Sequence, residues 1–316
     1  MPKMNSDRAS WRGIAFNLLS SVYLCLIVGL PTVSAFVLLS LSSRFPSAAM
    51  LFIPLEWSLS FIMVAGELSI QHQFAVQPGK FRRDVCDRRY FHRRLYGLCW
   101  TAVYYNKPVY FLCLSIPWLK WLTFRIFGYR GSMNFTVYPD TWIRDLPLLR
   151  FHDGAYVSNR ATLGTNIVLS NGFLLVDGIT LGPKSLVGHL AMLAPGVEME
   201  AGAEVAVGCG VGIGAKLGRN CFVGPCSVVE HGVRLGAKTL VGAHSYVGSG
   251  STLGDWTRIP AGAVLPPRSR TAAPKTSDPA LARADSVVRL GGHVSNQGIP
   301  VRANAASRSE WSDQTA

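Results

Sequence analysis

The sequence predicts a mainly β protein, a parallel β-helix, preceded by an α-helical membrane hairpin. From Phe151 to Leu265 every sixth residue is apolar. The stretch from Gly13 to Ser43 carries no charged residue. The chain as a whole is 49% hydrophobic and only 16% charged, which is unusual for a wholly soluble protein. The first observation predicts the β-helix and the other two predict the hairpin.

The six-residue period places one aliphatic side chain on each side of a three-sided coil of roughly 18 residues. Glycine often follows the aliphatic residue, where a corner needs tight backbone, and a small residue often stands four positions after it. We expect six to seven coils, no inserted loop, and a β-helix domain over residues 131–267. The periodic positions are Phe151, Val157, Leu163, Leu169, Leu175, Leu181, Val187, Leu193, Met199, Val205, Val211, Leu217, Val223, Val229, Leu235, Val241, Val247, Leu253, Ile259 and Leu265.

Residues 1–79 are expected to hold two transmembrane helices, at about 14–42 and 47–76, since about 20 apolar residues span a bilayer core. Pro31 would kink or tilt the first. A secretory signal peptide is the alternative for that segment, but its apolar core is too long and a second apolar stretch follows. Glu56 and Glu67 share one face of the second helix. They either line a functional cavity or lie hydrated near the helix ends.

Basic residues flank the hairpin on both sides, and residues 80–94 (KFRRDVCDRRYFHRR) are the richest in them. Positive flanks stay in the cytoplasm, so the chain is expected in the inner or cell membrane, multi-pass, with the β-helix facing the cytoplasm. The formal charge of +13 fits contact with anionic membrane lipids better than with nucleic acid, because the cluster is juxtamembrane.

Residues 80–130 form a basic juxtamembrane and interfacial segment. Aromatic residues are frequent between 95 and 127, while lysines, arginines and prolines interrupt the apolar runs. This composition favours one or two helices lying in the headgroup plane. A third full span is the alternative, and it would place the β-helix on the other side of the membrane. The residues expected to form an interfacial belt are Trp100, Tyr104, Tyr105, Tyr110, Trp118 and Trp121.

The repeats resemble those of hexapeptide-repeat acyltransferases. The approach segment RIFGYRGSMNFTVYPDTWIRDLPLLRFHDGAYVSNRATLGTN resembles the membrane-attached C-terminal modules of polylysine-synthetase-type non-ribosomal peptide synthetases. The resemblance covers about residues 80–265. It implies a left-handed β-helix, a homotrimer, and acyl or aminoacyl transfer from a thioester to an amine or hydroxyl acceptor. Unlike those synthetases, this chain has one module and neither an adenylation nor a carrier domain. Its co-substrate, acyl-CoA or a carrier-protein thioester, would be supplied separately, with a carrier protein or peptide synthetase as a possible partner.

Acyl transfer needs a base that accepts the proton of the nucleophile, and histidine commonly serves. Residues 18 apart are expected to stack, which places Asp153, Asn171 and His189 in one column with Asn171 orienting the His189 ring. His189 is the first choice for the base and His231 the second, while His244 stacks on Cys226. In the family that the chain resembles, the catalytic histidine lies in the trimer groove. Each histidine could equally be an ordinary surface residue.

No metal is expected, because His189 and His244 lie about three coils apart. The seven cysteines show no CxxC spacing and are expected to be free thiols. The tail, residues 268–316, is expected to be disordered, with only 278–290 able to form a capping helix. The alternative to a transferase is a non-enzymatic membrane scaffold or an accessory subunit of a peptide synthetase.

Overall fold

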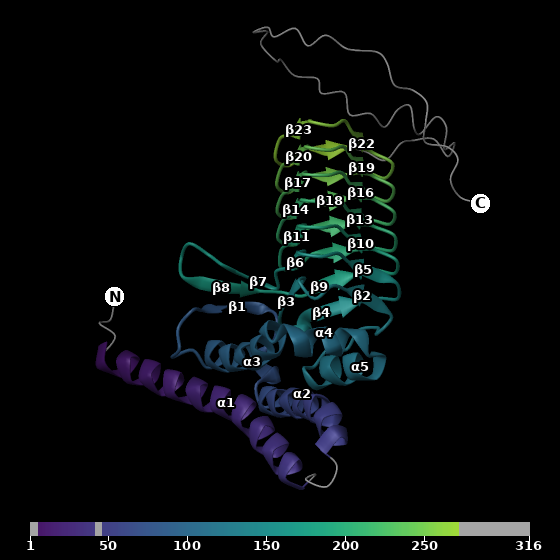
Figure 1. The fold of residues 1–316 in the computed structure, drawn as a ribbon. Helices are drawn as coiled ribbons and strands as arrows, with labels where there is room; N and C mark the ends of the chain where they lie inside the picture. The colour runs from purple at the N-terminus through teal and green to yellow at the C-terminus, as the bar shows by residue number, and fades with distance from the viewer. Residues whose placement is uncertain (1–5, 42–45, 272–316) are drawn as a thin grey trace, which may run out of the picture.

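The structure, a computed structural model, describes residues 6–41 and 46–271, with side chains described for residues 11–41 and 52–271. Figure 1 shows three layers: a helical hairpin, a platform of shorter helices, and a tall β-solenoid standing on the platform. The predicted 278–290 helix and most of the tail lie outside the described residues. The helices are α1 (Ser6–Leu41), α2 (Pro46–Ile70), η1 (Gln73–Ala75), α3 (Arg88–Tyr105), α4 (Lys107–Ser115), α5 (Pro117–Ile126) and η2 (Leu146–Leu148).

Two helices are long and apolar enough to cross a membrane, over Trp11–Leu41 in α1 and Phe52–Ile70 in α2. They pack side by side, and Ser34 Oγ of α1 donates to Glu56 Oε1 of α2 at 2.9 Å. Glu56 therefore joins the two helices, whereas Glu67 is exposed. The second span was expected to reach residue 76, but α2 ends at Ile70 and a 3₁₀ turn follows.

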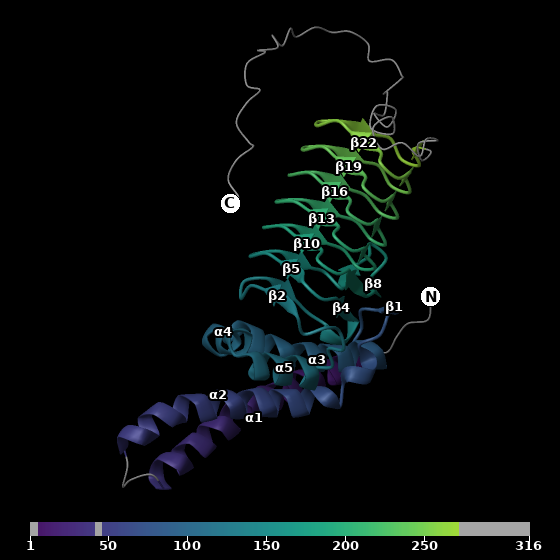
Figure 2. The same cartoon turned by 90° about the vertical axis from the view of Figure 1, so that its right-hand side faces the viewer.

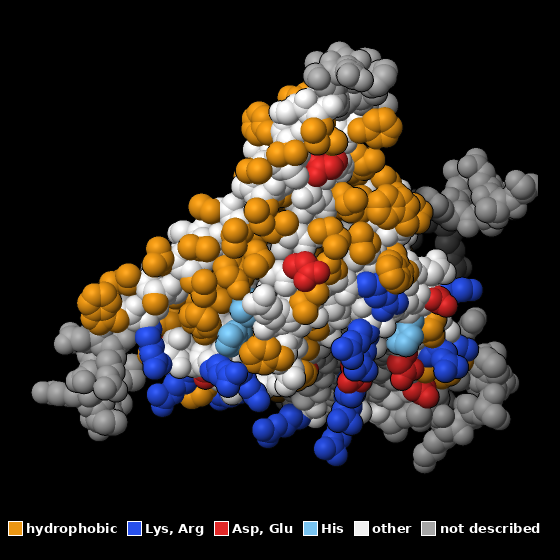
Figure 3. All heavy atoms as spheres, turned by 90° about the horizontal axis from the view of Figure 1, so that it is seen from below, with side chains coloured by type: hydrophobic (Ala, Val, Ile, Leu, Met, Phe, Trp, Pro, Cys, Tyr) orange, Lys and Arg blue, Asp and Glu red, His pale blue; other side chains and the backbone are white. Residues whose placement is uncertain are grey.

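Charge is unevenly distributed over the face of the molecule that carries the hairpin. Figure 3 shows Lys and Arg side chains gathered along one edge of this face, while the region toward the α1–α2 connection is hydrophobic. The basic edge is formed where α1 begins and where α2 passes into β1 (Gly79–Arg82) and α3. This distribution is the one that a helical hairpin with both ends on the same side of a bilayer requires.

The platform of α3, α4 and α5 lies directly beneath the first coil (Figures 1 and 2). Asp87 caps the start of α3 by accepting from the backbone N–H groups of Arg89 and Tyr90. Helices α4 and α5 each begin with a proline in the first turn and meet at a bend of 115°. Lys120 Nζ donates to the carbonyl oxygen of Phe135 at 2.5 Å, and Trp100 Nε1 to that of Ile143 at 2.7 Å. These bonds hold the platform helices against the solenoid.

The solenoid has three parallel sheets of seven strands, named here by their first strands. The β2 face holds β2 (Phe135–Val137), β5 (Ala155–Val157), β10 (Leu186–Val187), β13 (Glu204–Val205), β16 (Phe222–Val223), β19 (Leu240–Val241) and β22 (Arg258–Ile259). The β3 face holds β3 (Trp142–Ile143), β6 (Thr162–Leu163), β11 (Met192–Leu193), β14 (Gly210–Val211), β17 (Val228–Val229), β20 (Tyr246–Val247) and β23 (Val264–Leu265). The β4 face holds β4 (Leu149–Phe151), β9 (Ile179–Leu181), β12 (Glu198–Met199), β15 (Lys216–Leu217), β18 (Arg234–Leu235), β21 (Thr252–Leu253) and β24 (Arg270–Thr271).

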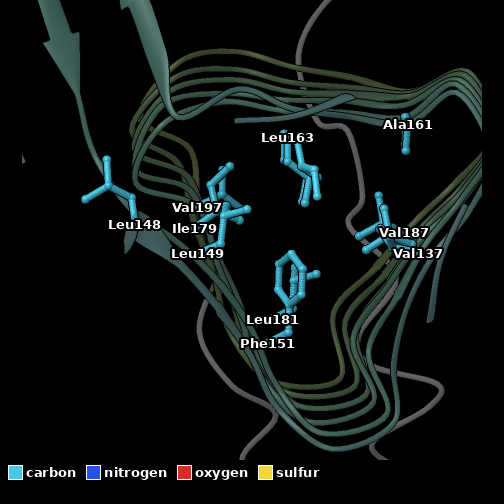
Figure 4. Packing of buried hydrophobic residues seen from close by; sticks show 14 of the residues in the cluster. Val137, Leu148, Leu149, Phe151, Ala161, Leu163, Ile179, Leu181, Val187 and Val197 are labelled. Carbon is cyan, nitrogen blue, oxygen red and sulfur yellow. The ribbon is translucent and has the colours of Figure 1, made fainter. Parts of the chain in front are cut away.

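The second residue of each two-residue strand points inward and fills a triangular core. Figure 4 shows Leu163, Val187 and Leu181 directed to the centre from three sides. All three have no exposed surface. At the lower end the core is closed by aromatic rings, with Phe135 5.1 Å from Phe151 and 5.4 Å from Phe124 of α5 between ring centroids. The predicted fold class, a parallel β-helix preceded by an α-helical hairpin, is confirmed.

The solenoid begins two strands earlier, with β2 and β3, than the six-residue period that starts at Phe151 indicates. Ile143 lies in the register of Leu163, and Phe151 in that of Leu181. The step from Ile143 to Phe151 is therefore eight residues (143 to 151), because η2 with Pro147 lies between them. This longer step hides the first coil from a search for sixth positions.

A hairpin of β7 (Asn166–Val168) and β8 (Phe173–Val176) leaves the solenoid after β6 and projects to the side (Figure 1). Val157 pairs with Val187, a coil of 30 residues (157 to 187), whereas Val187 pairs with Val205, a coil of 18 (187 to 205). The prediction of uninterrupted coils is wrong. The insertion is two hexads long, so the period stays in phase across it. Leu169 and Leu175 belong to the hairpin, not the core. Strand β8 also pairs with β1, which ties the hairpin to the helices.

Candidate functional site

A groove of about 550 Å³ lies between the base of the β7–β8 hairpin and the β3 face. It extends from the first coil, next to the platform, to the coil that carries β17. We refer to it as the hairpin groove. Its lining residues include Trp142, Arg144, Thr162, Gly164, Thr165, Asn166, Ile167, Met192, Ala194, Gly210, Gly212, Val228, Glu230 and His231.

One column of stacked residues forms the floor of the hairpin groove. The strand register places Arg144, Gly164, Ala194, Gly212 and Glu230 one above another, each directly after the inward residue of its strand. The three central residues have little or no side chain. The floor is therefore smooth and uncharged in its middle, with a cation at its foot and an anion at its top.

The outward residues of the β3 face form the apolar wall of the groove. Met192 and Val228 are exposed, and Gly210 stands between them in the ladder. A Cβ added at Gly210 would meet no atom within 4 Å. Gly210 therefore leaves a hollow between two larger side chains.

Glu230 and His231 stand together at the top of the groove. His231 Nδ1 accepts the backbone N–H of Ile213 at 2.9 Å, and His231 Nε2 lies 3.9 Å from Glu230 Oε2. With its Nδ1 lone pair engaged, the neutral ring carries its proton on Nε2. In this arrangement His231 is a hydrogen-bond donor toward the groove, and Glu230 is the group able to accept a proton.

A buried ion pair supports the foot of the groove. Arg93 of α3 donates to Asp145, which also accepts from Thr165 Oγ1 at 2.6 Å. Arg93 Nη2 further donates to Asn166 Oδ1 at 3.1 Å. The next residue, Arg144, has its Nε 3.8 Å from Asp145 Oδ1. Sequence reasoning missed this cluster, although two adjacent charges directly after the apolar Trp142–Ile143 pair in TWIRDLP were a visible sign.

His189 lies in a different place, at the corner between the β2 face and the β3 face. It is half-buried, and among the described residues its side chain makes no hydrogen bond. The register Val157↔Val187 places Asn159 below it, and Asn159 Oδ1 is buried without a partner in the described part of the chain. His189 is therefore adjacent to a polar group, but not to the one expected.

The predicted column of Asp153, Asn171 and His189 is wrong. Asn171 is exposed in the turn of the hairpin, where its Oδ1 accepts the N–H of Phe173 at 3.2 Å. Asp153 accepts from Ser132 at the first coil. The stacking distance is already 20 residues in the first coil, from Val137 to Val157, and here the twelve inserted residues break the 18-residue stacking again. Beyond it the stacking holds, and His244 follows Cys226 in one column as expected.

The outer surfaces of the three faces differ in chemistry. On the β4 face the outward residues include Glu198 and Lys216, which are paired at 2.8 Å. On the other two faces many outward residues are apolar and exposed or half-buried. Exposed apolar surface of this kind is typical of a face that another chain could cover. These residues are Leu186, Phe222 and Leu240 on the β2 face, and Met192, Val228, Tyr246 and Val264 on the β3 face.

The cysteines of the described chain are free thiols. Burial raises the pKa of Cys221 to about 12 and also raises that of Cys209, so neither is a ready nucleophile. Cys226 is exposed beside the His244 position. Within the described ranges, no group of three or more His, Cys, Asp or Glu side chains lies close enough to hold a metal ion.

Comparison with known proteins identifies the repeat. Residues 214–248 match the family described as "Bacterial transferase hexapeptide (six repeats)". No curated protein sequence matches the chain.

Three solved structures are similar to parts of the chain. The acetyltransferase domain of PglB from Neisseria gonorrhoeae in complex with acetyl coenzyme A is 15% identical, with a TM-score of 0.28 over 48% of this chain and 62% of that one. PerB from Caulobacter crescentus, in complex with CoA and GDP-perosamine, is 22% identical, with a TM-score of 0.20 over 40% and 52%. Serine acetyltransferase isoform 3 from Entamoeba histolytica is 11% identical, with a TM-score of 0.22 over 78% and 73%. The chain thus matches less than two thirds of the length of the first two proteins. What the comparisons establish is a hexapeptide repeat within a parallel β-helix.

Proposed function

We propose that this protein is a membrane-anchored acyl- or aminoacyltransferase that uses a thioester donor, acyl-CoA or a carrier-protein thioester, and an amine or hydroxyl acceptor. The observation that carries the proposal is the hairpin groove, which places Glu230 and His231 at the end of an apolar cleft. The hexapeptide repeat of residues 214–248, described as a transferase repeat, supports it.

The reaction joins the acceptor nitrogen or oxygen to the thioester carbonyl carbon, and the thiol leaves. A base must accept the acceptor's proton, and a donor must stabilise the negative charge on the carbonyl oxygen. His189 remains the first candidate for the base, since neither of its ring nitrogens is engaged in the described chain. It lies at the opposite edge of the β3 face from the groove of its own chain, so it would serve the groove of a neighbouring chain. His231, with its proton on Nε2, suits the second role, with Glu230 as the alternative base beside it.

We propose a homotrimer that packs through the apolar β2 and β3 faces. The groove lies at the edge of the β3 face, so a neighbouring chain would lie close to it. Asn171 at the hairpin turn could act only on such a neighbour, because it lies away from both histidines of its own chain. The α1–α2 hairpin would hold the trimer in the inner or cell membrane, with the basic edge and the β-helix in the cytoplasm.

The test is release of free thiol by the purified full chain in detergent, with acetyl-CoA, longer acyl-CoAs and a loaded carrier protein as donors. A mixture of amines and alcohols would serve as acceptors. We expect turnover that falls at least a hundredfold in His189→Ala or His231→Ala. His152→Ala is the matched control, since His152 is exposed and outside the hairpin groove.

The alternative function is a scaffold in which the β-helix only assembles and docks a partner. The two outward apolar faces would serve this function equally well. If protein shown to be trimeric released no thiol with any of the donors, the scaffold would be the better explanation.

A further inference from the structure

We infer that the hairpin groove binds an elongated molecule with an anionic group at one end, an apolar body, and a primary amine at the other. This inference rests on the proposed function, because it describes the acceptor of that site. It follows from the floor column of the groove, in which Arg144 and Glu230 stand at opposite ends. The register separates them by four strand spacings, roughly 19 Å at ~4.8 Å for each spacing.

The foot of the groove carries one net positive charge. Arg93 and Arg144 contribute two positive charges and Asp145 one negative charge, and Asp145 is already bound by Arg93 and Thr165. Arg93 Nε, Arg144 Nε and Asp145 Oδ1 are buried here and make no hydrogen bond in the described chain, and the last two face each other at 3.8 Å. Asn166 uses its Oδ1 to accept from Arg93, which leaves its NH₂ group as a donor. Arg144 and Asn166 together form a site for a carboxylate or phosphate.

The top of the groove carries one net negative charge. Glu230 is partly buried, with 29% of its side chain exposed, and the adjacent His231 is neutral when its Nδ1 accepts the N–H of Ile213. A primary ammonium group can donate to Glu230, which is the alternative base of the proposed reaction. The acceptor's nucleophile would thus be placed where the proposed reaction needs it.

The middle of the groove fits an uncharged chain. Gly164, Ala194 and Gly212 leave the floor without long side chains, and Gly210 leaves a hollow in the wall between Met192 and Val228. A charged group would find no partner along this stretch, whereas methylene groups would be removed from water. The groove has opposite charges at its ends and an apolar middle. It therefore selects a ligand of matching length that carries an anionic group at one end and a cationic group at the other.

The experiment measures binding without any donor. The full chain in detergent is titrated with ω-amino carboxylic acids of increasing chain length, by calorimetry and saturation-transfer NMR. Alkylamines and alkyl carboxylates of equal length lack one charge, and ω-aminoalkyl phosphates distinguish phosphate from carboxylate as the anion. We expect an optimum length, and affinity at least tenfold lower for probes that lack either charge.

Variants assign each end of the ligand. Arg144→Gln should weaken the amino acids at least tenfold and leave the alkylamines unchanged, while Glu230→Gln should weaken both. The controls are Arg234→Gln and Glu198→Gln, whose side chains point outward on the β4 face. If Arg144→Gln fails to fold, Gly210→Leu fills the hollow without removing a charge and should weaken the whole series.

Any of three results would overturn the inference. These are an affinity that does not depend on the length of the probe, an equal affinity for probes that carry one charge and probes that carry both, or an affinity that these variants leave unchanged. Because no donor is present, binding that behaves as expected alongside absent thiol release would reject the transferase and leave the groove ligand standing. If the protein released thiol but the variants left probe binding unaltered, the transferase would stand and the proposed groove ligand would be rejected.

Discussion

Arg93 of α3 and Asp145 of the first coil form an ion pair closed off from solvent, with side-chain exposures of 3% and 0%. Asp145 is held in a left-handed conformation with φ of 54°, at the start of η2. The pair joins the platform of α3, α4 and α5 to the solenoid at the foot of the hairpin groove. Such a pair contributes little net stability compared with apolar residues, but breaking it leaves an uncompensated buried charge.

The substitution Arg93→Met should lower the free energy of unfolding by about 3–5 kcal/mol, because buried Asp145 would lose its hydrogen-bonded cation and keep only the more distant Arg144. The measurement is chemical unfolding of the full chain in detergent, followed by circular dichroism. Asp145→Asn added to Arg93→Met should recover a large part of the loss, since the remaining buried group would be neutral.

The matched control is Lys216→Met. Lys216 pairs with Glu198 at 2.8 Å, but both side chains are about half exposed. Exposed pairs contribute less than about 1 kcal/mol, so this substitution should change stability very little. Equal losses at Arg93 and Lys216 would contradict the buried character of the first pair.

Leu193 and Leu175 occupy equivalent positions in the six-residue period but different places in the structure. Leu193 is fully buried in the solenoid core, whereas Leu175 lies half-buried in β8 of the hairpin. Leu193→Ala should therefore cost about 2–5 kcal/mol in stability, including the cavity it leaves. Leu175→Ala should cost much less, as judged by the midpoint of unfolding. A similar cost at both positions would place Leu175 in the core after all.

The same pair of leucines shows how far the sequence could predict the fold. One aliphatic side chain per six residues is a physical requirement of the narrow core, so the β-helix could be predicted from Val187 onward coil by coil. The inserted hairpin keeps the same phase because it is two hexads long and carries leucines at both periodic positions, although β8 buries Leu174 and Val176 and not the periodic Leu175. The six-residue spacing alone cannot distinguish a solenoid coil from the inserted hairpin. The pairing of Val157 with Val187 does distinguish them.

The candidate site was harder to predict than the fold for a related reason. The expected partnership of Asn171 with His189 assumed an 18-residue coil where the chain uses 30. His231 was identified as a candidate, but Arg144 and Asn166, which line the other end of the groove, come from the irregular first coil and the insertion, outside the repeat rule. Sites on a regular solenoid are formed where regularity fails, and a periodic pattern carries no information there.

A pH-sensitive contact lies where α1, the end of α2 and α3 meet. Tyr23 Oη and His72 Nε2 are 2.9 Å apart, and the Nδ1 atoms of His72 and His92 are also 2.9 Å apart. The contact between the Nδ1 atoms of His72 and His92 holds a single proton, because two protonated nitrogens would repel each other. Burial, with His92 adding to it, lowers the pKa of His72 to about 4. Burial and the nearby Arg88 lower the pKa of His92 as well.

Because the folded pKa lies below the value of about 6.5 in an unfolded chain, the folded state binds fewer protons. The contribution of His72 is therefore fully present above about pH 6.5 and is lost as the pH falls toward 4. We expect a loss on the order of 1–2 kcal/mol after allowance for solvent that reaches His92. Unfolding midpoints between pH 7.5 and 4.5 would measure it. His72→Gln should flatten this dependence, and an unchanged slope in that variant would assign the effect to other groups.

Deletion of residues 166–177 should remove the hairpin while leaving the solenoid intact. The ends of the insertion are already adjacent, since the N–H of Asp177 donates to the carbonyl oxygen of Thr165 at 3.0 Å. Joining Thr165 to Gly178 restores a six-residue step from Leu163 to Leu181, which is the spacing of a regular coil. The shortened chain should keep its β-sheet circular dichroism and lose stability through the missing β8–β1 pairing and the lost hydrogen bond from Arg93 to Asn166. It should bind ω-amino acids at least tenfold more weakly, because Asn166 and Ile167 form one side of the groove. Loss of the β-sheet signal would mean that the hairpin is needed for folding, and undiminished binding would place the ligand elsewhere.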